Sequence, residues 1–268
     1  MNQQASQQDV VIRVRELNNR FGANEVHTNL DLELYRREIL GVVGGSGTGK
    51  SVLLRSIVGL HEPHSGVIEV FGHELRALSA DQRSRVERRF GVLFQGGALF
   101  TSLTLQENVA LPLIEHARLS REDAEYLARV KLALVGLPAN ASTMVPAQLS
   151  GGMVKRASLA RAIALDPEIL FLDEPTAGLD PIGAAAFDRL IVTLRDALGF
   201  SVFLVTHDLD TLYSTCDRVA VLSNKRVLVE GPLETVENTD DPWIRDYFHG
   251  PRGRAANRSR LVTGGEVG

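Results

Sequence analysis

A short glycine-rich run near the start of the chain carries the residue types that bind phosphate. Residues 44–51 read Gly-Gly-Ser-Gly-Thr-Gly-Lys-Ser, which fits the pattern G-x-x-x-x-G-K-[ST]. The glycines allow successive backbone N–H groups to turn toward one phosphate, and a helix that begins near Gly49 directs its positive end there. We expect Lys50 to reach the β- and γ-phosphates of a nucleotide and the Ser51 hydroxyl to ligate Mg²⁺.

The segments on either side of this run fit a phosphate-binding loop (P-loop). Residues 39–43 are apolar, as expected of a buried strand, and residues 52–57 have a helical pattern. This order of strand, loop and helix is the context that the motif requires. The alternative is a glycine-rich turn that only joins two elements, and the flanking segments disfavour it.

An acidic pair follows a second predicted strand. Asp173 and Glu174 come directly after the continuous apolar run 169–172, which is typical of a strand buried on both faces. Ligands of open α/β sheets gather at the carboxyl ends of the strands. We therefore expect Asp173 to hold Mg²⁺ and Glu174 to polarise an attacking water as general base. An acidic pair before Pro175 could also be only the start of a helix.

Gln95 and His207 have the same placement, because each follows an apolar run, at 90–94 and 201–206. A glutamine there can sense the metal and the γ-phosphate. A histidine there can hold the γ-phosphate or position Glu174. Taken alone, each residue is more often a structural hydrogen-bonding group, but their shared position at strand ends favours the functional interpretation.

Ser150, Gly151 and Gly152 precede a helix predicted over residues 153–165. The amino terminus of a helix attracts an anion, because its first N–H groups have no partner within the helix. We therefore expect these three residues to contact an anion.

In their order along the chain, these motifs resemble those of the ATP-binding subunits of ABC transporters. The order matches that family's Walker A motif (44–51), Q-loop (95), signature (149–152), Walker B strand (169–173), catalytic carboxylate, D-loop (177–180) and switch histidine. The similarity covers about residues 11–232 and includes every one of these motifs. It implies a P-loop NTPase fold of the α/β class, an ABC-type nucleotide-binding domain with a RecA-like core, an antiparallel β subdomain and an inserted helical subdomain.

The resemblance also implies an ATPase that uses ATP and Mg²⁺, with roles for particular residues. Catalysis is assigned to Glu174, His207, Gln95 and Lys50, and Mg²⁺ to Ser51, Gln95 and Asp173. Adenine is expected to stack on an aromatic ring, and the signature and D-loop to contact the nucleotide of a second protomer. The residues implied at the nucleotide are Phe21, Gly44, Gly45, Ser46, Gly47, Thr48, Gly49, Lys50, Ser51, Gln95, Ser150, Gly151, Gly152 and Asp180.

The organisation of the chain agrees with one cassette and an extension. Residues 9–232 are expected to form the ABC ATPase domain, with antiparallel strands early in the chain and helices over about 96–160. Residues 233–268 are expected to form an extension, a helix followed by a basic tail. The segment after Pro242 has two open interpretations. It is a docked helix followed by a solvated tail, or Trp243, Tyr247 and Phe248 anchor on a second protomer while Arg252, Arg254, Arg258 and Arg260 meet anionic lipid or a partner.

Composition narrows the classes of function. The 268 residues are 44% hydrophobic, enough for a substantial α/β core, and no apolar run approaches the roughly 18 residues that span a bilayer. The start of the chain lacks a signal-peptide pattern, so other chains are expected to form any membrane path. The one cysteine, Cys216, allows no internal disulfide. The net charge of −4 argues against a nucleic-acid partner.

Finer phrases in the sequence resemble MlaF-type ATPases of the MCE (Mla) phospholipid-transport systems. These phrases lie at residues 95–100, 149–156, 206–210 and 242–254. The resemblance implies a homodimer on the cytoplasmic face of the inner membrane, bound to an MlaE-like permease, an MlaD-like periplasmic MCE protein and, in some systems, an MlaB-like STAS-domain protein. The implied function is to energise phospholipid transport between the inner and outer membranes, which maintains the lipid asymmetry of the outer membrane.

Other assignments remain open at the level of sequence. The chain could serve another permease, for amino acids or lipoproteins, or could be an ABC ATPase that signals without transport. The apolar run 96–100 is either a surface that couples the ATPase to a membrane partner or ordinary packing beneath the helices.

Overall fold

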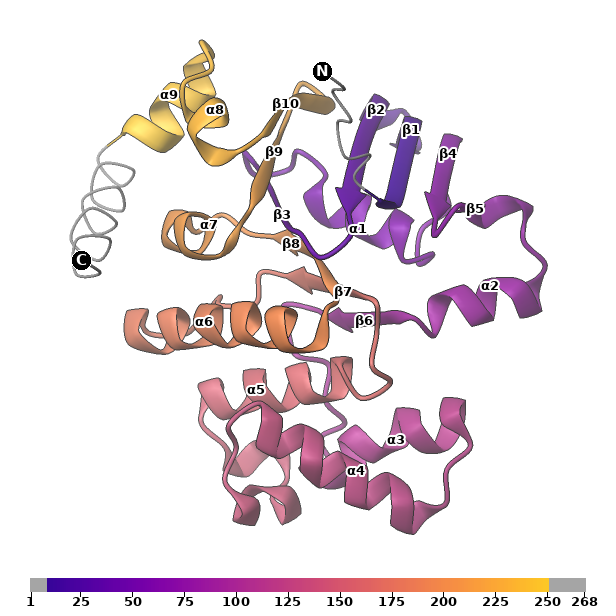
Figure 1. Ribbon diagram of the computed structural model, residues 1–268. Helices are drawn as coiled ribbons and strands as arrows, with labels where there is room; N and C mark the ends of the chain where they lie inside the picture. Colours follow the sequence, from indigo (N-terminus) through magenta and orange to yellow (C-terminus); the bar gives the residue numbers. More distant parts are fainter. Residues whose placement is uncertain (1–8, 251–268) are drawn as a thin grey trace, which may run out of the picture. The chain divides into compact units, whose positions relative to one another are not determined.

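The computed structural model describes residues 9–250 (Figure 1). These residues form two compact units, one of residues 9–86 with 216–250 and the other of residues 87–215. No helix within 9–250 is long and apolar enough to cross a membrane. We call the first the loop unit, because it contains the P-loop, and the second the helical unit. The domain boundaries at 9–232, 96–160 and 233–268 stay a prediction.

The loop unit contains an antiparallel sheet of four strands. β1 (Val10–Phe21) and β2 (Asn24–Tyr35) form a long hairpin, and β1 also pairs with β4 (Ser65–Val70), which pairs with β5 (His73–Glu74). Alternate residues of β2, such as Leu30, Leu32 and Leu34, are buried, because successive side chains of a strand point to opposite faces. The predicted antiparallel segment is confirmed.

The same unit contains the strand that leads into the P-loop. β3 (Ile39–Gly44) is buried along its whole length and runs parallel to β9 (Arg218–Ser223). β9 turns back into β10 (Arg226–Gly231) through Asn224 and Lys225, both with positive φ, as in a type I′ hairpin turn. β9 and β10 thus form a hairpin around Asn224. α1 (Lys50–Ile57) follows β3 directly after the loop.

Helices complete the loop unit. The 3₁₀ turn η1 (Leu75–Ala77) precedes α2 (Ala80–Glu87), and α8 (Leu233–Glu237) leads to α9 (Pro242–His249). The Asp241 side chain caps α9, and Ile244 and Phe248 are buried. The docked-helix interpretation is therefore confirmed. The prediction that Phe248 anchors on a second protomer is wrong, because this side chain is only 1% exposed and is buried within its own chain. The four arginines from 252 onward lie outside the described residues.

The helical unit contains three parallel strands. β7 (Ile169–Asp173) pairs with β6 (Phe90–Leu93) on one side and with β8 (Ser201–Val205) on the other. All residues of β7 and β8 are buried, which explains their continuous apolar sequences. Phe171 packs between Phe90 and Phe203 at ring-centroid distances of 5.3 and 5.8 Å. α6 (Pro181–Leu198) and α7 (Leu209–Thr215) follow β7 and β8 respectively.

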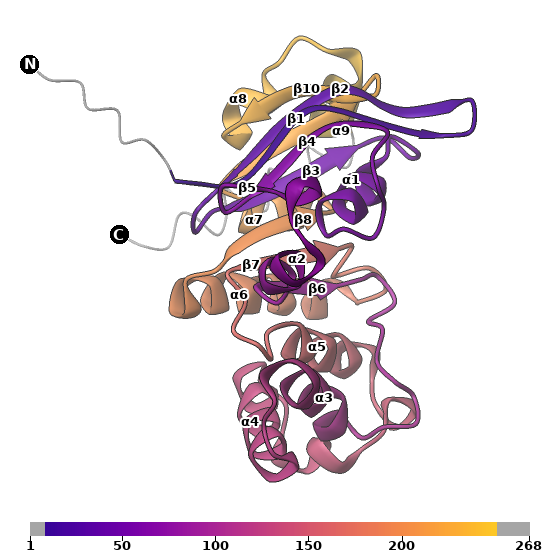
Figure 2. The same cartoon turned by 90° about the vertical axis from the view of Figure 1, so that its right-hand side faces the viewer.

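The remaining helices pack against one another in the lower part of Figure 2. They are α3 (Leu105–Ala117), α4 (Arg121–Leu134) and α5 (Gly151–Ala162), with the 3₁₀ turns η2 (Ala139–Thr143) and η3 (Pro146–Gln148) before α5. The side chains of Thr104 and Ser120 cap the starts of α3 and α4, which lie in the segment predicted to be helical. α5 ends three residues before the predicted Leu165, because the chain must turn ahead of Pro167, and Asp166 takes a positive φ there.

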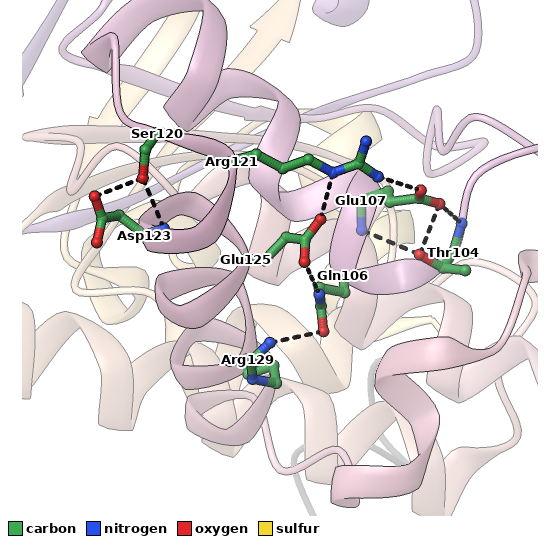
Figure 3. A network of polar contacts seen from close by, with 8 residues as sticks. All are labelled: Thr104, Gln106, Glu107, Ser120, Arg121, Asp123, Glu125 and Arg129. Atoms are coloured by element: carbon green, nitrogen blue, oxygen red, sulfur yellow. Dashed lines mark hydrogen bonds and ion pairs between the residues drawn. The ribbon is translucent and has the colours of Figure 1, made fainter.

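Polar contacts connect α3 and α4 on their exposed side (Figure 3). Arg121 bridges Glu125 at 2.7 Å and Glu107 at 3.2 Å, and Gln106 donates to Glu125 at 2.8 Å. Exposed ion pairs contribute little to stability, at most about 1 kcal/mol each. Buried side chains, among them Val109 on α3 and Leu132 on α4, therefore contribute more to the stability of these helices than the exposed network does.

A buried carboxyl group joins α6 to α7 in the helical unit. The Asp188 side chain accepts a hydrogen bond from the Thr211 hydroxyl at 2.9 Å, and its other oxygen has no hydrogen-bond partner among the described residues. Burial raises the pKa of Asp188 to about 6, and the carboxylates of Asp208 and Asp210 add to this effect. Because the unfolded chain releases this proton more easily, Asp188 lowers stability increasingly as the pH rises from 4 through 6.

We expect Asp188→Asn to stabilise the protein at neutral pH, because asparagine still accepts from Thr211 and does not ionise. The gain in the free energy of unfolding is at most about 3 kcal/mol at pH 7.5, at about 1.4 kcal/mol per pKa unit. Urea unfolding at pH 7.5 and pH 4 measures it, and the difference between the two proteins should vanish at the lower pH. An equal difference at both pH values would contradict this account.

Candidate nucleotide site

The P-loop is a tight turn between β3 and α1 that requires glycine at two of its positions. Gly44 has a φ of 156°, and a Cβ atom there would lie 2.4 Å from the backbone oxygen of Leu222. Gly49 has a φ of 93°, and a Cβ atom there would lie 2.4 Å from Nε2 of His27. Larger residues would therefore clash with β9 at one end of the loop and with β2 at the other.

The Lys50 side chain lies across this loop. Its Nζ atom donates to the carbonyl oxygens of Gly44 at 2.8 Å and Gly45 at 3.0 Å, and the Thr48 hydroxyl donates to Gly45 at 2.9 Å. Gly49 caps α1 without a side-chain hydrogen bond. The N-cap residue of α1 therefore supplies no side-chain acceptor, and a helix start of this kind suits an anion.

Phe21 ends β1 and is 51% exposed, which suits a ring that offers a face to a ligand. One side of the ring stacks on His61, with ring centroids 4.8 Å apart and planes at 29°. Stacking on an aromatic face tolerates any planar base and adds to the burial of apolar area. The arrangement agrees with the adenine contact implied for Phe21.

Sequence reasoning missed a second aromatic neighbour of the P-loop. The indole nitrogen of Trp243, on α9, lies 3.5 Å from where a Cβ of Gly45 would stand. Trp243 stacks on Tyr247 with ring centroids 4.6 Å apart. Residues about 200 positions apart in the sequence thus lie side by side at the loop, and no sequence pattern predicts this contact.

In the helical unit the acidic pair stands at the carboxyl end of β7. Asp173 is buried, and the Glu174 carboxylate lies 2.8 Å from Nδ1 of His207. Glu174 has a φ of 50°, a left-handed conformation that is strained for a side chain of this size and is typical of functional positions. Its backbone N–H donates to Val205 at 2.9 Å, which helps to hold this conformation. The structure therefore brings the predicted base and the predicted switch histidine together.

Lys155 on α5 joins two of the predicted motifs and was not predicted as a site residue. Its Nζ atom donates to the backbone oxygens of Gln95 at 2.7 Å and Glu174 at 3.4 Å. Burial lowers the pKa of Lys155, while the carboxylates of Glu174 and Asp173 act in the opposite direction. The ammonium group thus holds the start of the Q-loop against the end of β7.

The signature and the D-loop lie at helix starts of the same unit. The Ser150 side chain caps α5 by accepting from the N–H of Met153, and both Ser150 and Gly151 are exposed. A Cβ atom at Gly151 would meet nothing within 4 Å, so the start of α5 is open. Asp180 caps α6 and accepts from the N–H of Gly183 at 2.9 Å. Asp180 is thus engaged in its own helix rather than with the other site residues.

A buried strand that enters a P-loop, together with a second unit that carries an acidic pair, a histidine and an open helix start, defines an ATP-binding cassette. A family model described as ABC transporter matches residues 27–177. The chain belongs to the ABC transporter family and is an ATP-binding ATPase of that family. The predicted family, fold class and activity are confirmed.

Two groups of curated relatives match nearly the whole chain. One is "Probable ribonucleotide transport ATP-binding protein mkl" of Mycobacterium leprae, 37% identical over 91% of this chain and 70% of the relative. The other is "Intermembrane phospholipid transport system ATP-binding protein MlaF". The Haemophilus influenzae protein is 36% identical over 90% of both chains, and the Escherichia coli K12 protein is 36% identical over 90% of this chain and 89% of its own.

Solved structures agree with the fold. A dimeric ATP-binding cassette, MJ0796, in a post-hydrolysis state with ADP and Pi has a TM-score of 0.75 at 29% identity, over 83% of this chain and 98% of its own. The protein cbiO1 of Clostridium perfringens, part of the ABC transporter complex cbiONQ, has a TM-score of 0.78 at 25% identity, over 97% of this chain and 99% of its own.

Proposed function

We propose that this chain is the ATPase subunit of a transporter that moves phospholipid between the inner and outer membranes and so maintains the lipid asymmetry of the outer membrane. It would act on the cytoplasmic face of the inner membrane, held there by a permease. The observation that carries the proposal is the similarity to the MlaF proteins over nine-tenths of both chains. The phrases at 95–100 and 242–254 support the same assignment.

We assign ATP binding and hydrolysis to the residues described above. The P-loop N–H groups and Lys50 would hold the phosphates, and the face of Phe21 would hold the adenine. Hydroxyl, carboxylate and amide oxygens suit Mg²⁺, and Ser51, Asp173 and Gln95 supply them. Glu174 would take a proton from the attacking water, and His207, at 2.8 Å from it, would orient the carboxylate. Mg²⁺ would neutralise charge that develops on the phosphates.

We further propose a homodimer that sandwiches two ATP molecules. The open start of α5 at Ser150, Gly151 and Gly152 offers N–H groups and a helix dipole to an anion. The γ-phosphate held by a second protomer is that anion in this proposal. The dimeric ATP-binding cassette MJ0796, solved with ADP and Pi, supports the same arrangement here.

The proposed membrane partners are an MlaE-like permease and an MlaD-like MCE protein, and we add an MlaB-like STAS-domain protein as a cytosolic partner. Phe100, just after the Q-loop, is 46% exposed, and the Arg161 guanidinium covers its ring at 4.9 Å. The Asn108 side chain holds the Phe100 backbone on both sides. Its amide oxygen accepts from the Phe100 N–H at 2.7 Å, and its amide nitrogen donates to the Phe100 carbonyl oxygen at 3.0 Å. An exposed aromatic ring on a fixed backbone suits a docking contact for a permease.

We expect Phe100→Glu to uncouple transport from ATP hydrolysis. The charge would disrupt an apolar contact with the permease but would leave the nucleotide residues intact. The rate of lipid transfer in reconstituted vesicles should fall at least tenfold, which corresponds to a loss of about 1.4 kcal/mol or more in coupling free energy. The basal ATPase rate should change less than twofold. Leu198→Glu is the matched control, because Leu198 is 43% exposed at the far end of α6. Unchanged transfer by the Phe100 variant would remove this residue from the interface.

The experiment that tests the transport assignment is mass spectrometry of the native complex. A tag on this chain retrieves the complex from detergent-solubilised membranes, and proteins and lipids are measured together. An MCE-domain protein, a permease and bound phospholipid would support the proposal. A permease with bound nucleotide cargo, as the name of the mycobacterial relative implies for that protein, would overturn the phospholipid assignment. A membrane protein without transported cargo would favour a signalling role instead.

A further inference from the structure

Behind the P-loop lies a small polar network that the proposed mechanism does not use. It consists of Asn19 on β1, His27 on β2 and Ser56 on α1, which are 1%, 1% and 2% exposed. The Asn19 amide nitrogen lies 2.9 Å from Nδ1 of His27 and 3.0 Å from the Ser56 hydroxyl. The Ser56 hydroxyl in turn donates to the backbone oxygen of Val52 at 2.9 Å. Three buried polar side chains therefore join the β1–β2 hairpin to the helix that follows the P-loop.

These hydrogen bonds determine which nitrogen of His27 carries its proton. The Ser56 hydroxyl has one proton, and it goes to Val52, so Ser56 accepts from the Asn19 amide. With the Asn19 amide oriented as it is here, where its Oδ1 atom is buried and has no hydrogen-bond partner among the described residues, the second proton of the amide nitrogen is directed at Nδ1 of His27, which accepts it. The neutral imidazole therefore carries its proton on Nε2. Burial, the largest cause, lowers the pKa of His27 to about 4, so the ring is neutral at physiological pH.

The protonated Nε2 atom is directed at the P-loop. A Cβ atom at Gly49 would lie 2.4 Å from Nε2 and 3.0 Å from Cε1 of the same ring, and 2.5 Å from a methyl group of Val26. Nε2 is buried and has no hydrogen-bond partner among the described residues. The nearby Gly49 backbone raises the pKa of His27, against the larger effect of burial. The Gly49 carbonyl accepts from the N–H of Leu53 and has a second lone pair to offer.

We propose that His27 is a positioning residue for the P-loop, whose ring stands behind Gly49 and supports the left-handed turn that presents the first N–H groups of α1 to phosphate. When nucleotide tightens the loop, the Nε2–H group donates to the Gly49 carbonyl. The inference rests on the proposed role of the P-loop in binding ATP. It adds a residue on β2, 22 positions before Gly49, that no P-loop motif contains.

Packing alone does not account for a histidine here. An apolar side chain would fill the same space without burying a donor that has no partner, and such donors are rare in folded proteins. The ring is also held by a hydrogen bond on its other nitrogen, which fixes both its tautomer and its direction. A group that is buried, oriented and unsatisfied beside a ligand-binding loop is expected where binding completes its hydrogen bond.

The first test compares variants of the purified full-length protein. We expect His27→Leu to raise the KM for MgATP about fivefold, the effect of one hydrogen bond of ordinary strength, with kcat changed less than twofold. His27→Gln returns an N–H donor at similar reach and should restore KM to within about twofold of the wild-type value. His73→Leu, on the exposed strand β5, is the matched control. A KM unchanged in His27→Leu, with only a lower melting temperature, would overturn the proposal.

A second measurement is made on the wild-type ring, in case His27→Leu fails to fold. Nitrogen NMR of the ¹⁵N-histidine-labelled wild-type protein reports the tautomer of His27 directly. We expect an Nε2–H signal at pH 7 that moves when MgATP is added. A proton on Nδ1, or a signal that ATP leaves in place, would contradict the proposal. The spectrum of His27→Gln, or of Ser56→Ala if that variant does not fold, assigns the signal.

Failure of this proposal is distinguishable from failure of the P-loop assignment. If Lys50→Ala keeps normal affinity for ATP, the P-loop is not the ATP-binding site, and the proposed role of His27 is wrong as well. If Lys50→Ala loses binding while both His27 measurements are negative, the site stands and only the role of His27 is wrong.

Discussion

Replacing Glu174 with glutamine is expected to stop ATP turnover almost completely while leaving ATP bound. Glutamine has nearly the same shape as glutamate but cannot accept the proton of the attacking water. The loss of a general base typically lowers kcat about 10²–10⁴-fold. The 2.8 Å contact between the Glu174 carboxylate and Nδ1 of His207 places a base and the group that orients it together, as this chemistry requires. Release of phosphate at saturating MgATP measures the effect.

The matched control for this prediction is Glu168→Gln. Glu168 immediately precedes the same strand, β7, where it pairs with Arg89 at 2.7 Å. Glu168 carries the same charge as Glu174 but lies at the opposite end of the strand from the acidic pair. We therefore expect the kcat of the Glu168→Gln variant to differ less than twofold from that of the wild-type protein. A wild-type rate in Glu174→Gln would remove Glu174 from the role of general base. A loss of ATP binding in that variant would instead give Glu174 a structural role.

The second large effect is expected at Lys50. Its ammonium group now donates to two carbonyl oxygens of the loop and would transfer to the phosphates when ATP binds. Hydrogen bonds to charged groups contribute about 1.5–3 kcal/mol each, so removing them should weaken ATP binding about 10²-fold in Lys50→Ala. Equilibrium binding of radiolabelled ATP with the purified protein measures the change.

Lys225→Ala is the control for Lys50→Ala. Lys225 is an exposed lysine of the β9–β10 turn that pairs with Glu25 at 3.3 Å. Replacing Lys225 removes the same charge from the loop unit and leaves the P-loop unchanged. The affinity for ATP should therefore stay within about twofold of the wild-type value. Comparable loss of affinity in both variants would indicate a general electrostatic effect, and intact binding in Lys50→Ala would move the nucleotide elsewhere.

The parts of the fold that could be predicted are those in which local sequence and burial agree. β3, β7 and β8 are buried along their whole lengths and read as continuous apolar runs. The helix starts at Thr104 and Ser120 carry their own capping residues, so nearby residues alone determine them. α2 was not predicted, because only Val86 of its eight residues is buried and its sequence has little apolar periodicity.

The site divides in the same way. P-loop residues are recognisable because a turn that wraps phosphate needs glycine at fixed spacings. Lys155, Trp243 and His27 were not identified, because each acts through a contact that depends on the folded chain. Lys155 reaches Gln95 across 60 positions, and Trp243 reaches Gly45 across nearly 200. Strict alternation from Leu30, Leu32 and Leu34 would place His27 on the opposite, exposed face of β2, and the irregularity at Asn29, which has a φ of 47°, turns it inward.

The central claim of this account is that two chains complete each other's nucleotide sites. The most direct test is native mass spectrometry of Glu174→Gln with MgATP, since this variant should hold the assembly before hydrolysis. We expect a species of two chains with two ATP molecules. This species should be absent when ADP replaces ATP. It should also be absent when the substitution Ser150→Glu, which places a negative charge at the open start of α5, is combined with Glu174→Gln. A single chain with one ATP under all these conditions would contradict the claim.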